Sequence, residues 1–245
     1  MKTIIDINAD VGEGIGNEAQ LMPFISSCNI ACGGHAGDDE TMKEVIKIAK
    51  DYGVKIGAHP SFPDKENFGR QPMELSCAAL FKTLEDQTCR LIAHLDDLQA
   101  SLHHIKLHGA LYNLAAKSET TATVVIEFMK SFAFPVYLYV PYKSVIADVA
   151  ITNNIPIIYE AFADRNYNRN LTLVSRDQEN AVIKDGETMF NHVFRMISRN
   201  NVLTIDGSQI PLKAHTFCIH GDTPSALNLL QYLHSKLAAH DIQVL

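Results

Sequence analysis

The stretch Asn29–Ala58, NIACGGHAGDDETMKEVIKIAKDYGVKIGA, contains a complete strand–helix–strand unit. Two short apolar runs, Asn29–Cys32 and Val54–Ala58, flank the segment Thr41–Tyr52, whose apolar residues recur at spacings of three and four. An aspartate pair precedes this segment at the N-cap position, and Gly53 suits the left-handed residue that ends a helix. Strands joined through a helix pair in parallel, so this unit predicts a parallel β/α fold.

The same alternation of apolar runs and helical patterns continues along the whole chain. The predicted strands are Ile4–Ala9, Asn29–Cys32, Val54–Ala58, His104–Leu107, Val136–Val140, Pro156–Glu160, Leu171–Val174 and Thr216–Ile219. The predicted helices are Thr41–Tyr52, Cys77–Leu102, Thr120–Ser131, Met189–Ser198 and Ser225–Ala239. An open doubly wound sheet and a closed barrel both fit this order. Reactive residues follow almost every strand, and only in a barrel do all strand ends share one mouth. We therefore predict an α/β fold, a single distorted β/α barrel of seven or eight strands that spans residues 1–245.

Composition and charge exclude several classes of protein. The chain has 245 residues and a formal net charge of −7, without a cluster of basic and aromatic residues, so nucleic-acid binding is not expected. No apolar run approaches the roughly 18 residues of a membrane span. The five cysteines are scattered and form no CxxC pair, which is typical of free thiols in a reducing compartment. We expect a cytoplasmic protein with no membrane partner.

Polar residues gather after the predicted strands. They are Asn8, Asp10, Glu13, His35, His59, Lys106, His108, Tyr112, Asn113, Glu160, Asp164, Arg165, Arg176, His220 and Asp222. A single histidine at a strand end is more often structural than catalytic. Four histidines at four strand ends, each close to glycine or proline, indicate a functional site, since glycine lets a ligand approach the backbone closely.

The residue types suggest acid–base chemistry on a small anionic substrate. Imidazoles pass protons near neutral pH, and a neighbouring carboxylate orients the ring or activates water. Arg165 and Arg176 suit a substrate carboxylate, and Lys106 suits a developing oxyanion or a phosphoryl group. Asp10 with two of the histidines, those at 35 and 59, is a candidate site for a divalent metal ion, although no local spacing forms a metal motif.

Three other features carry less weight. The loop Gly12–Gly16 follows a strand but lacks the spacing and the lysine of a nucleotide-binding loop. The pair His103–His104 stands at a strand start, away from the other histidines, and is expected to be structural. Cys32, close to His35, is a minor alternative as a thiol nucleophile.

At these residues the chain resembles the LamB/YcsF family. The matching blocks are DINADVGEGIG (Asp6–Gly16), NIACGGHAGD (Asn29–Asp38), IGAHPSFPD (Ile56–Asp64), FGR (Phe68–Arg70), KLHGALYN (Lys106–Asn113), EAFADRNY (Glu160–Tyr167) and CIHGDTP (Cys218–Pro224). They occur in order over nearly the whole chain. The chain departs from the usual pattern at Gly34, Gln71 and Leu107, none of which belongs to the charged set.

This resemblance implies a distorted barrel related to polysaccharide deacetylases and similar hydrolases. It also implies an activity, the ATP-dependent opening of 5-oxoproline to L-glutamate, performed with two partners, the B and C subunits of 5-oxoprolinase. A related barrel family holds a metal with one aspartate and two histidines, which by analogy supports Asp10, His35 and His59. Because the chain shows no nucleotide motif, we expect ATP to bind without one or to be brought by the partners, and the chain alone to be nearly inactive.

The expected roles divide the polar residues into two groups. The catalytic group is Asp10, His35, His59, Lys106, His108, Asp164 and His220, and the substrate-binding group is Asn8, Glu13, Asn113, Glu160, Arg165, Arg176 and Asp222. Two alternatives remain open. One is a stand-alone metal-dependent amidase or deacetylase, and the other is a non-catalytic subunit that delivers substrate.

Overall fold

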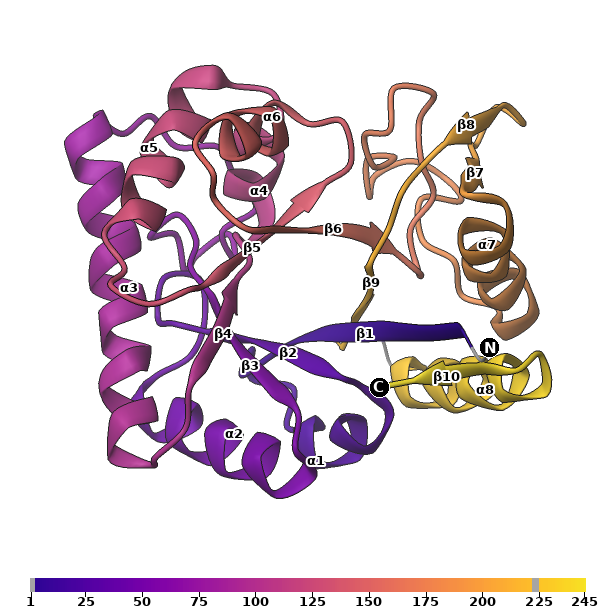
Figure 1. Cartoon of the computed structure of the whole chain (residues 1–245), viewed down its shortest axis with the longest axis horizontal. Helices are drawn as coiled ribbons and strands as arrows, with labels where there is room; N and C mark the ends of the chain where they lie inside the picture. Colours follow the sequence, from indigo (N-terminus) through magenta and orange to yellow (C-terminus); the bar gives the residue numbers. More distant parts are fainter. Residues whose placement is uncertain (1–2, 222–224) are drawn as a thin grey trace.

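Seven parallel strands close into a barrel in the computed structural model, which describes residues 3–221 and 225–245. The barrel strands are β1 (Thr3–Val11), β2 (Ser27–Ala31), β3 (Lys55–His59), β4 (Leu102–Ile105), β5 (Tyr137–Pro141), β6 (Ile157–Phe162) and β9 (Thr216–His220). The barrel closes where β9 pairs with β1, from Asp6 opposite Thr216 to Asp10 opposite His220. The predicted parallel β/α barrel is therefore confirmed, with seven strands. An eighth strand, β10 (Ile242–Val244), pairs with the start of β1 outside the ring, so the two ends of the described chain lie close together (Figure 1).

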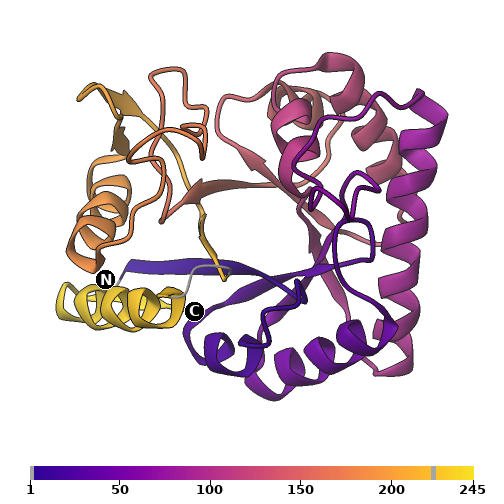
Figure 2. The same cartoon turned by 180° about the vertical axis from the view of Figure 1, so that it is seen from behind.

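Helices surround the barrel on its outer side (Figures 1 and 2). They are α1 (Glu18–Leu21), a 3-10 turn η1 (Met22–Phe24), α2 (Asp39–Tyr52), α3 (Cys77–Asp97), α4 (Gly109–Ala115), α5 (Glu119–Lys130), α6 (Val145–Thr152), α7 (Gly186–Arg199) and α8 (Ala226–Ala239). The ends of α2 follow the sequence signals. The Asp38 carboxylate accepts a hydrogen bond from the Thr41 amide at 2.8 Å, and Gly53 is left-handed with a φ of 69°. In the part of the chain that is described, no helix is both long enough and apolar enough to cross a bilayer.

Several elements differ from the sequence prediction. The predicted strand Leu171–Val174 is wrong, because it lies in an irregular segment where the Val174 carbonyl accepts a hydrogen bond from the Arg165 side chain instead of a neighbouring strand. The turn-rich stretch 202–214 contains a small hairpin of β7 (Asn201–Leu203) and β8 (Gln209–Pro211). Helix α3 ends five residues before the predicted Leu102, which instead begins β4. The short elements α4, α6 and β10 were not predicted from the periodicity.

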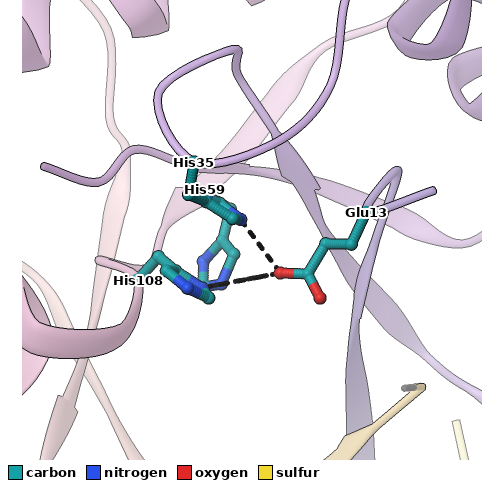
Figure 3. A group of neighbouring side chains, drawn as sticks. All are labelled: Glu13, His35, His59 and His108. Carbon is teal, nitrogen blue, oxygen red and sulfur yellow. Dashed lines mark hydrogen bonds and ion pairs between the residues drawn. The ribbon is translucent and has the colours of Figure 1, made fainter. Parts of the chain in front are cut away.

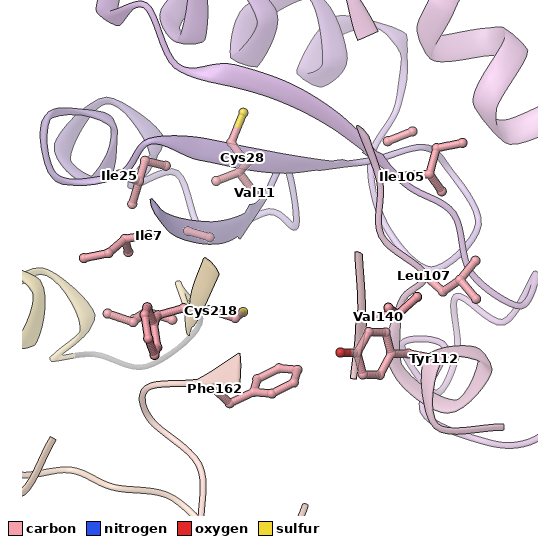
Figure 4. Close-up of a cluster of buried hydrophobic side chains, with 14 of the residues drawn as sticks. Ile7, Val11, Ile25, Cys28, Ile105, Leu107, Tyr112, Val140, Phe162 and Cys218 are labelled. Atoms are coloured by element: carbon pink, nitrogen blue, oxygen red, sulfur yellow. The ribbon is translucent and has the colours of Figure 1, made fainter. Parts of the chain in front are cut away.

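The inside of the barrel is polar. Along β1 the side chains alternate, so that Asp6, Asn8 and Asp10 share the face that points inward, while Ile5 and Ile7 share the other. The apolar core lies mostly between the strands and the helices, and Figure 4 shows buried apolar side chains that several strands contribute to it. A barrel interior is usually filled with branched apolar residues, so this polar interior needs an explanation.

A hydrogen-bonded group of side chains occupies the amino-terminal half of the interior. We call Asp6, Ser27, His104, Tyr139 and Thr216 the lower layer. The Ser27 hydroxyl donates to Asp6 Oδ1 at 2.7 Å, and the Thr216 hydroxyl donates to the same oxygen at 2.6 Å. The Tyr139 hydroxyl lies 3.3 Å from the Ser27 oxygen. The His104 ring stacks on Tyr139 with ring centroids 3.9 Å apart. Each of these side chains therefore pairs with another side chain of the protein.

Candidate active site

Four side chains converge at the carboxyl ends of the first barrel strands, the mouth of the barrel. They are Glu13, His35, His59 and His108, which we call the histidine cluster (Figure 3). One potential ligand atom from each lies within 4.8 Å of the others. Glu13 Oε1 lies 3.0 Å from His35 Nε2, 3.5 Å from His108 Nδ1 and 4.0 Å from His59 Nε2. The three imidazoles are buried and Glu13 is partly buried, so these contacts form largely outside water.

Backbone carbonyls fix which ring nitrogens carry hydrogen. His59 Nδ1 lies 2.8 Å from the Lys106 carbonyl oxygen, and His108 Nε2 lies 2.9 Å from that of Phe68. A carbonyl only accepts, so both nitrogens must donate. The two remaining nitrogens, His59 Nε2 and His108 Nδ1, then face each other at 2.9 Å with Glu13 nearby. Two lone pairs at this distance require a cation between them, either a proton or a metal ion.

Two close backbone approaches hold the cluster in place. Gly109 has a φ of 53°, and a Cβ there would lie 2.7 Å from the Gly69 carbonyl oxygen, so only glycine fits. This contact keeps the turn at Phe68 against His108. On its other side His108 stacks on His35, with ring centroids 3.6 Å apart and an angle of 2°. The rings are therefore held before any ligand arrives.

The donor set fits a divalent metal ion. Burial lowers the pKa of both His35 and His108, which favours the neutral imidazole that binds metal. A metal-binding histidine usually donates its second N–H to a carbonyl or carboxylate, as His59 and His108 do here. The predicted metal-binding group was Asp10 with His35 and His59. The observed cluster contains the same two histidines with Glu13 and His108 in place of Asp10. Asp10 Oδ2 lies 3.3 Å from His59 Nε2, but its other oxygen accepts two hydrogen bonds inside the barrel.

A buried lysine links this cluster to the other strands. Lys106 Nζ lies 2.9 Å from Asp10 Oδ1, 2.9 Å from Glu160 Oε1, 3.3 Å from Asn8 Oδ1 and 3.0 Å from Cys218 Sγ. Although burial opposes its charge, the Asp10 and Glu160 carboxylates hold the pKa of Lys106 well above its usual range. Four acceptors surround three ammonium protons, so Lys106 holds two carboxylates in place.

A carboxylate–imidazole pair lies on the β6–β9 side of the mouth. Asp164 Oδ2 accepts from the backbone amide of His220 and lies 3.0 Å from His220 Nδ1. Despite burial, the nearby His220 ring lowers the pKa of Asp164, so this group is an anion. An anion at Nδ1 keeps a proton there and leaves Nε2 as a base, which is the arrangement of acid–base pairs in hydrolases. The Phe162 ring stacks beside His220, with centroids 5.5 Å apart.

The remaining predicted residues lie in different settings. Arg165 is buried and donates to the carbonyl oxygens of Val174 at 2.6 Å and Ala181 at 3.3 Å, so it holds the loop after β6. Arg176 and Asn113 are exposed, and Asp222 lies outside the described residues. A substrate contact by any of them stays a prediction.

Other sequence interpretations need correction or addition. Gly57 does not leave room for a ligand, because a Cβ there would lie 2.1 Å from His104 Nε2. Cys32 is buried with its pKa raised to about 12, which does not favour a thiol nucleophile. Asn29 was missed, although it donates to both Asn8 and Asp10 at 2.8 Å. The alternation of polar residues along apolar strands was the signal that indicated it.

Known proteins resemble this chain over its whole length. The model of the LamB/YcsF family matches residues 5–245. A protein from Haemophilus influenzae (strain PittEE), named as the A subunit of 5-oxoprolinase, is 39% identical over 240 residues, which is 98% of each chain. The crystal structure of a lactam utilization protein from Thermus thermophilus superposes with a TM-score of 0.92 at 33% identity, covering 100% of this chain and 99% of that one.

A more distant structure shares the fold alone. A family 4 carbohydrate esterase from Streptomyces lividans, in complex with acetate, has a TM-score of 0.52 at 8% identity and covers 99% of this chain and 91% of its own. The expected likeness to deacetylase-type barrels is therefore present in the fold. From the match over residues 5–245 and the identity with full-length relatives, the chain belongs to the LamB/YcsF family.

Proposed function

We propose that this chain is the A subunit of a 5-oxoprolinase, which opens 5-oxoproline to L-glutamate at the expense of ATP together with the B and C subunits. The observation that carries the proposal is the Asp164–His220 pair at the mouth of the barrel, in a chain 39% identical to a protein of that name. The five cysteines are free thiols, which supports the cytoplasm, where ATP is made and used, as the site of the reaction.

The chemistry requires a base and a rigid anionic site. A five-membered lactam is a poor electrophile, and transfer of the γ-phosphoryl group of ATP to its oxygen activates the carbon. Water then adds to that carbon, the C–N bond breaks as nitrogen takes up a proton, and a second water hydrolyses the acyl phosphate. His220 Nε2, oriented by Asp164, is placed to take the proton of the attacking water and to return it to the leaving nitrogen.

The same proposal places a divalent metal ion at the histidine cluster, held by Glu13, His35, His59 and His108. Such an ion, when bound, stabilises negative charge on a substrate oxygen. Elemental analysis of protein purified without chelators should find roughly one divalent ion per chain, and His59→Asn should lose it. His104→Gln, a change at another buried histidine, should retain the ion. Wild-type protein without a stoichiometric ion would remove the metal from the proposal.

The activity is tested by reconstitution. ADP formation that depends on 5-oxoproline should require this chain and both partners, the B and C subunits, together. Full activity from this chain alone would contradict the need for partners. A complete mixture without 5-oxoproline-dependent turnover would refute the function itself. Metal-dependent cleavage of small amides or acetylated sugars without ATP would instead support a stand-alone amidase.

A further inference from the structure

Besides His35 Nδ1, two buried polar atoms at the mouth are left over by the contacts described above. The Tyr112 hydroxyl and Glu160 Oε2 have no hydrogen-bond partner among the described residues. Tyr112 is 7% exposed and Glu160 is 2% exposed. A buried polar group without a partner destabilises the fold, and such groups are rare. The Tyr112 hydroxyl and the Glu160 carboxylate lie near each other without an aligned hydrogen bond, so a ligand that enters between them would satisfy both.

The two atoms offer one donor and one acceptor, and the Glu160 carboxylate lies near enough to the Tyr112 hydroxyl to affect its pKa. Tyr112 lies on α4, and Figure 4 shows its hydroxyl directed toward the interior and its ring near that of Phe162. Burial and the nearby Glu160 carboxylate raise the pKa of Tyr112 well above its usual range, so its hydroxyl remains a donor. Glu160 Oε1 is engaged by Lys106 and by Asn8, which leaves Oε2 as an acceptor.

The chemistry that matches this pair is the edge of a lactam. In a five-membered lactam the amide is cis, so its N–H and its C=O point out from the same edge of the ring. In an ordinary trans peptide the two groups point to opposite sides. A donor and an acceptor side by side therefore complement a lactam edge and do not complement a peptide.

We infer that Tyr112 and Glu160 form the lactam-recognition site, in which the Tyr112 hydroxyl donates to the substrate carbonyl oxygen and Glu160 Oε2 accepts the ring N–H. This inference rests on the proposed 5-oxoprolinase function and adds the residues that select its substrate. Lys106, expected from the sequence to contact the amide oxygen, has its three protons directed at acceptors of the protein. It positions Glu160 instead. The Phe162 ring, 5.9 Å from that of Tyr112, supplies an apolar wall for the ring methylenes.

The test uses a matched pair of ligands. One is 5-oxoproline, and the other is the γ-lactone of 2-hydroxyglutarate, in which a ring oxygen replaces the ring N–H. Calorimetry on the assembled complex of this chain with the B and C subunits measures both affinities without turnover. The wild-type complex should bind the lactam about tenfold or more tightly than the lactone, because the lactone oxygen faces the Glu160 carboxylate.

Glu160→Gln is expected to reverse this preference. Lys106 and Asn8 both donate to Oε1, so they will hold the glutamine carbonyl there and direct its NH2 to the position of Oε2. A donor then faces the ring atom, and the ratio of lactam to lactone affinity should fall to about one or below. Tyr112→Phe should weaken both ligands by roughly threefold to tenfold and leave the ratio unchanged. Tyr159→Phe, the same change at the tyrosine that precedes Glu160 on β6 and points to the opposite face of the strand, is the control and should change neither affinity.

The outcomes separate the two proposals. A ratio that is unchanged in Glu160→Gln, or affinities that are unchanged in Tyr112→Phe, overturns the lactam-recognition site while turnover of 5-oxoproline by the wild-type complex preserves the function. If the wild-type complex neither binds nor turns over 5-oxoproline, the proposed function itself is wrong. Far-ultraviolet circular dichroism and thermal unfolding verify that each variant is folded.

Discussion

The lower layer and the mouth of the barrel are built from the same residue types but differ in how their hydrogen bonds are used. In the lower layer Asp6, Ser27 and Thr216 satisfy one another. At the mouth, two imidazole nitrogens meet face to face, and His35 Nδ1, the Tyr112 hydroxyl and Glu160 Oε2 lack partners among residues 3–221 and 225–245. No atom of the lower layer is in that unpaired set within the same described residues.

This difference separates folding from function better than burial does. Both regions hold buried carboxylates, histidines and hydroxyls, so burial of polar residues alone does not mark an active site. A polar group whose hydrogen bonds all form within the protein stabilises the fold and has no donor or acceptor left for a ligand. A buried group without a hydrogen-bond partner can still bind a ligand, and binding then supplies the missing hydrogen bond. We therefore expect substitutions in the two regions to affect different measurements.

The largest expected effect is on turnover at the mouth. In Asp164→Asn, the His220 backbone amide will hold the remaining carbonyl oxygen, and a neutral NH2 replaces the oxygen that lies 3.1 Å from His220 Nδ1. The anion that keeps the proton on Nδ1 and leaves Nε2 as the base is then lost. We expect kcat of the reconstituted complex to fall by about a hundredfold to ten-thousandfold, with the fold retained. Steady-state kinetics of 5-oxoproline-dependent ADP release measures it.

The matched control is Asp6→Asn, an equal change at a buried carboxylate of the lower layer. Its Oδ1 will continue to accept from Ser27 and Thr216, so the site above is undisturbed. The variant should keep kcat within about threefold of the wild type and lose only the contact with Lys55 at 3.4 Å. If Asp6→Asn lost as much kcat as Asp164→Asn, the lower layer and the mouth would not differ in their role in turnover.

A second expected effect concerns stability and pH in the lower layer. Burial, together with the charges of His103 and Lys106, holds the pKa of His104 well below its usual range. The unfolded chain takes up a proton at this residue below about pH 6.5, whereas the folded protein does not, so stability falls as the pH decreases from that value. His104→Gln, which keeps a neutral donor toward Asn29, should reduce the slope of unfolding free energy by up to about 1.4 kcal/mol per pH unit. Urea denaturation between about pH 7 and about pH 5, on either side of the usual histidine pKa, measures the slope. Parallel slopes for the variant and the wild type would show that His104 is protonated in the fold.

The sequence predicted the architecture because strand and helix periodicities are local properties. All seven barrel strands overlap a predicted run, although β4 begins two residues before the predicted His104 and β1 extends two residues past the predicted Ala9. The sequence also predicted that the histidines at the strand ends share one mouth, because parallel strands end on the same side of a barrel. The sequence did not reveal that Lys106 forms ion pairs with Asp10 and Glu160, or that Arg165 donates hydrogen bonds to a loop. These contacts depend on which residues lie opposite one another in three dimensions. Likewise, the metal group was predicted with Asp10 because only the structure shows that Glu13 lies within reach of all three imidazoles.

The smallest expected effect separates the two regions most cleanly, because both changes remove one buried hydroxyl. Thr216→Val removes a group that donates to Asp6 at 2.6 Å and accepts from Asn8 at 2.8 Å, so the free energy of unfolding should fall by roughly 1–3 kcal/mol. Tyr112→Phe removes a hydroxyl without a partner among the described residues, so the free energy of unfolding should stay the same or rise by up to about 1 kcal/mol. Urea unfolding of the two variants beside the wild type decides the matter. A loss of stability in Tyr112→Phe as large as in Thr216→Val would mean that the Tyr112 hydroxyl is already paired within the fold, and the mouth would then be as complete as the lower layer.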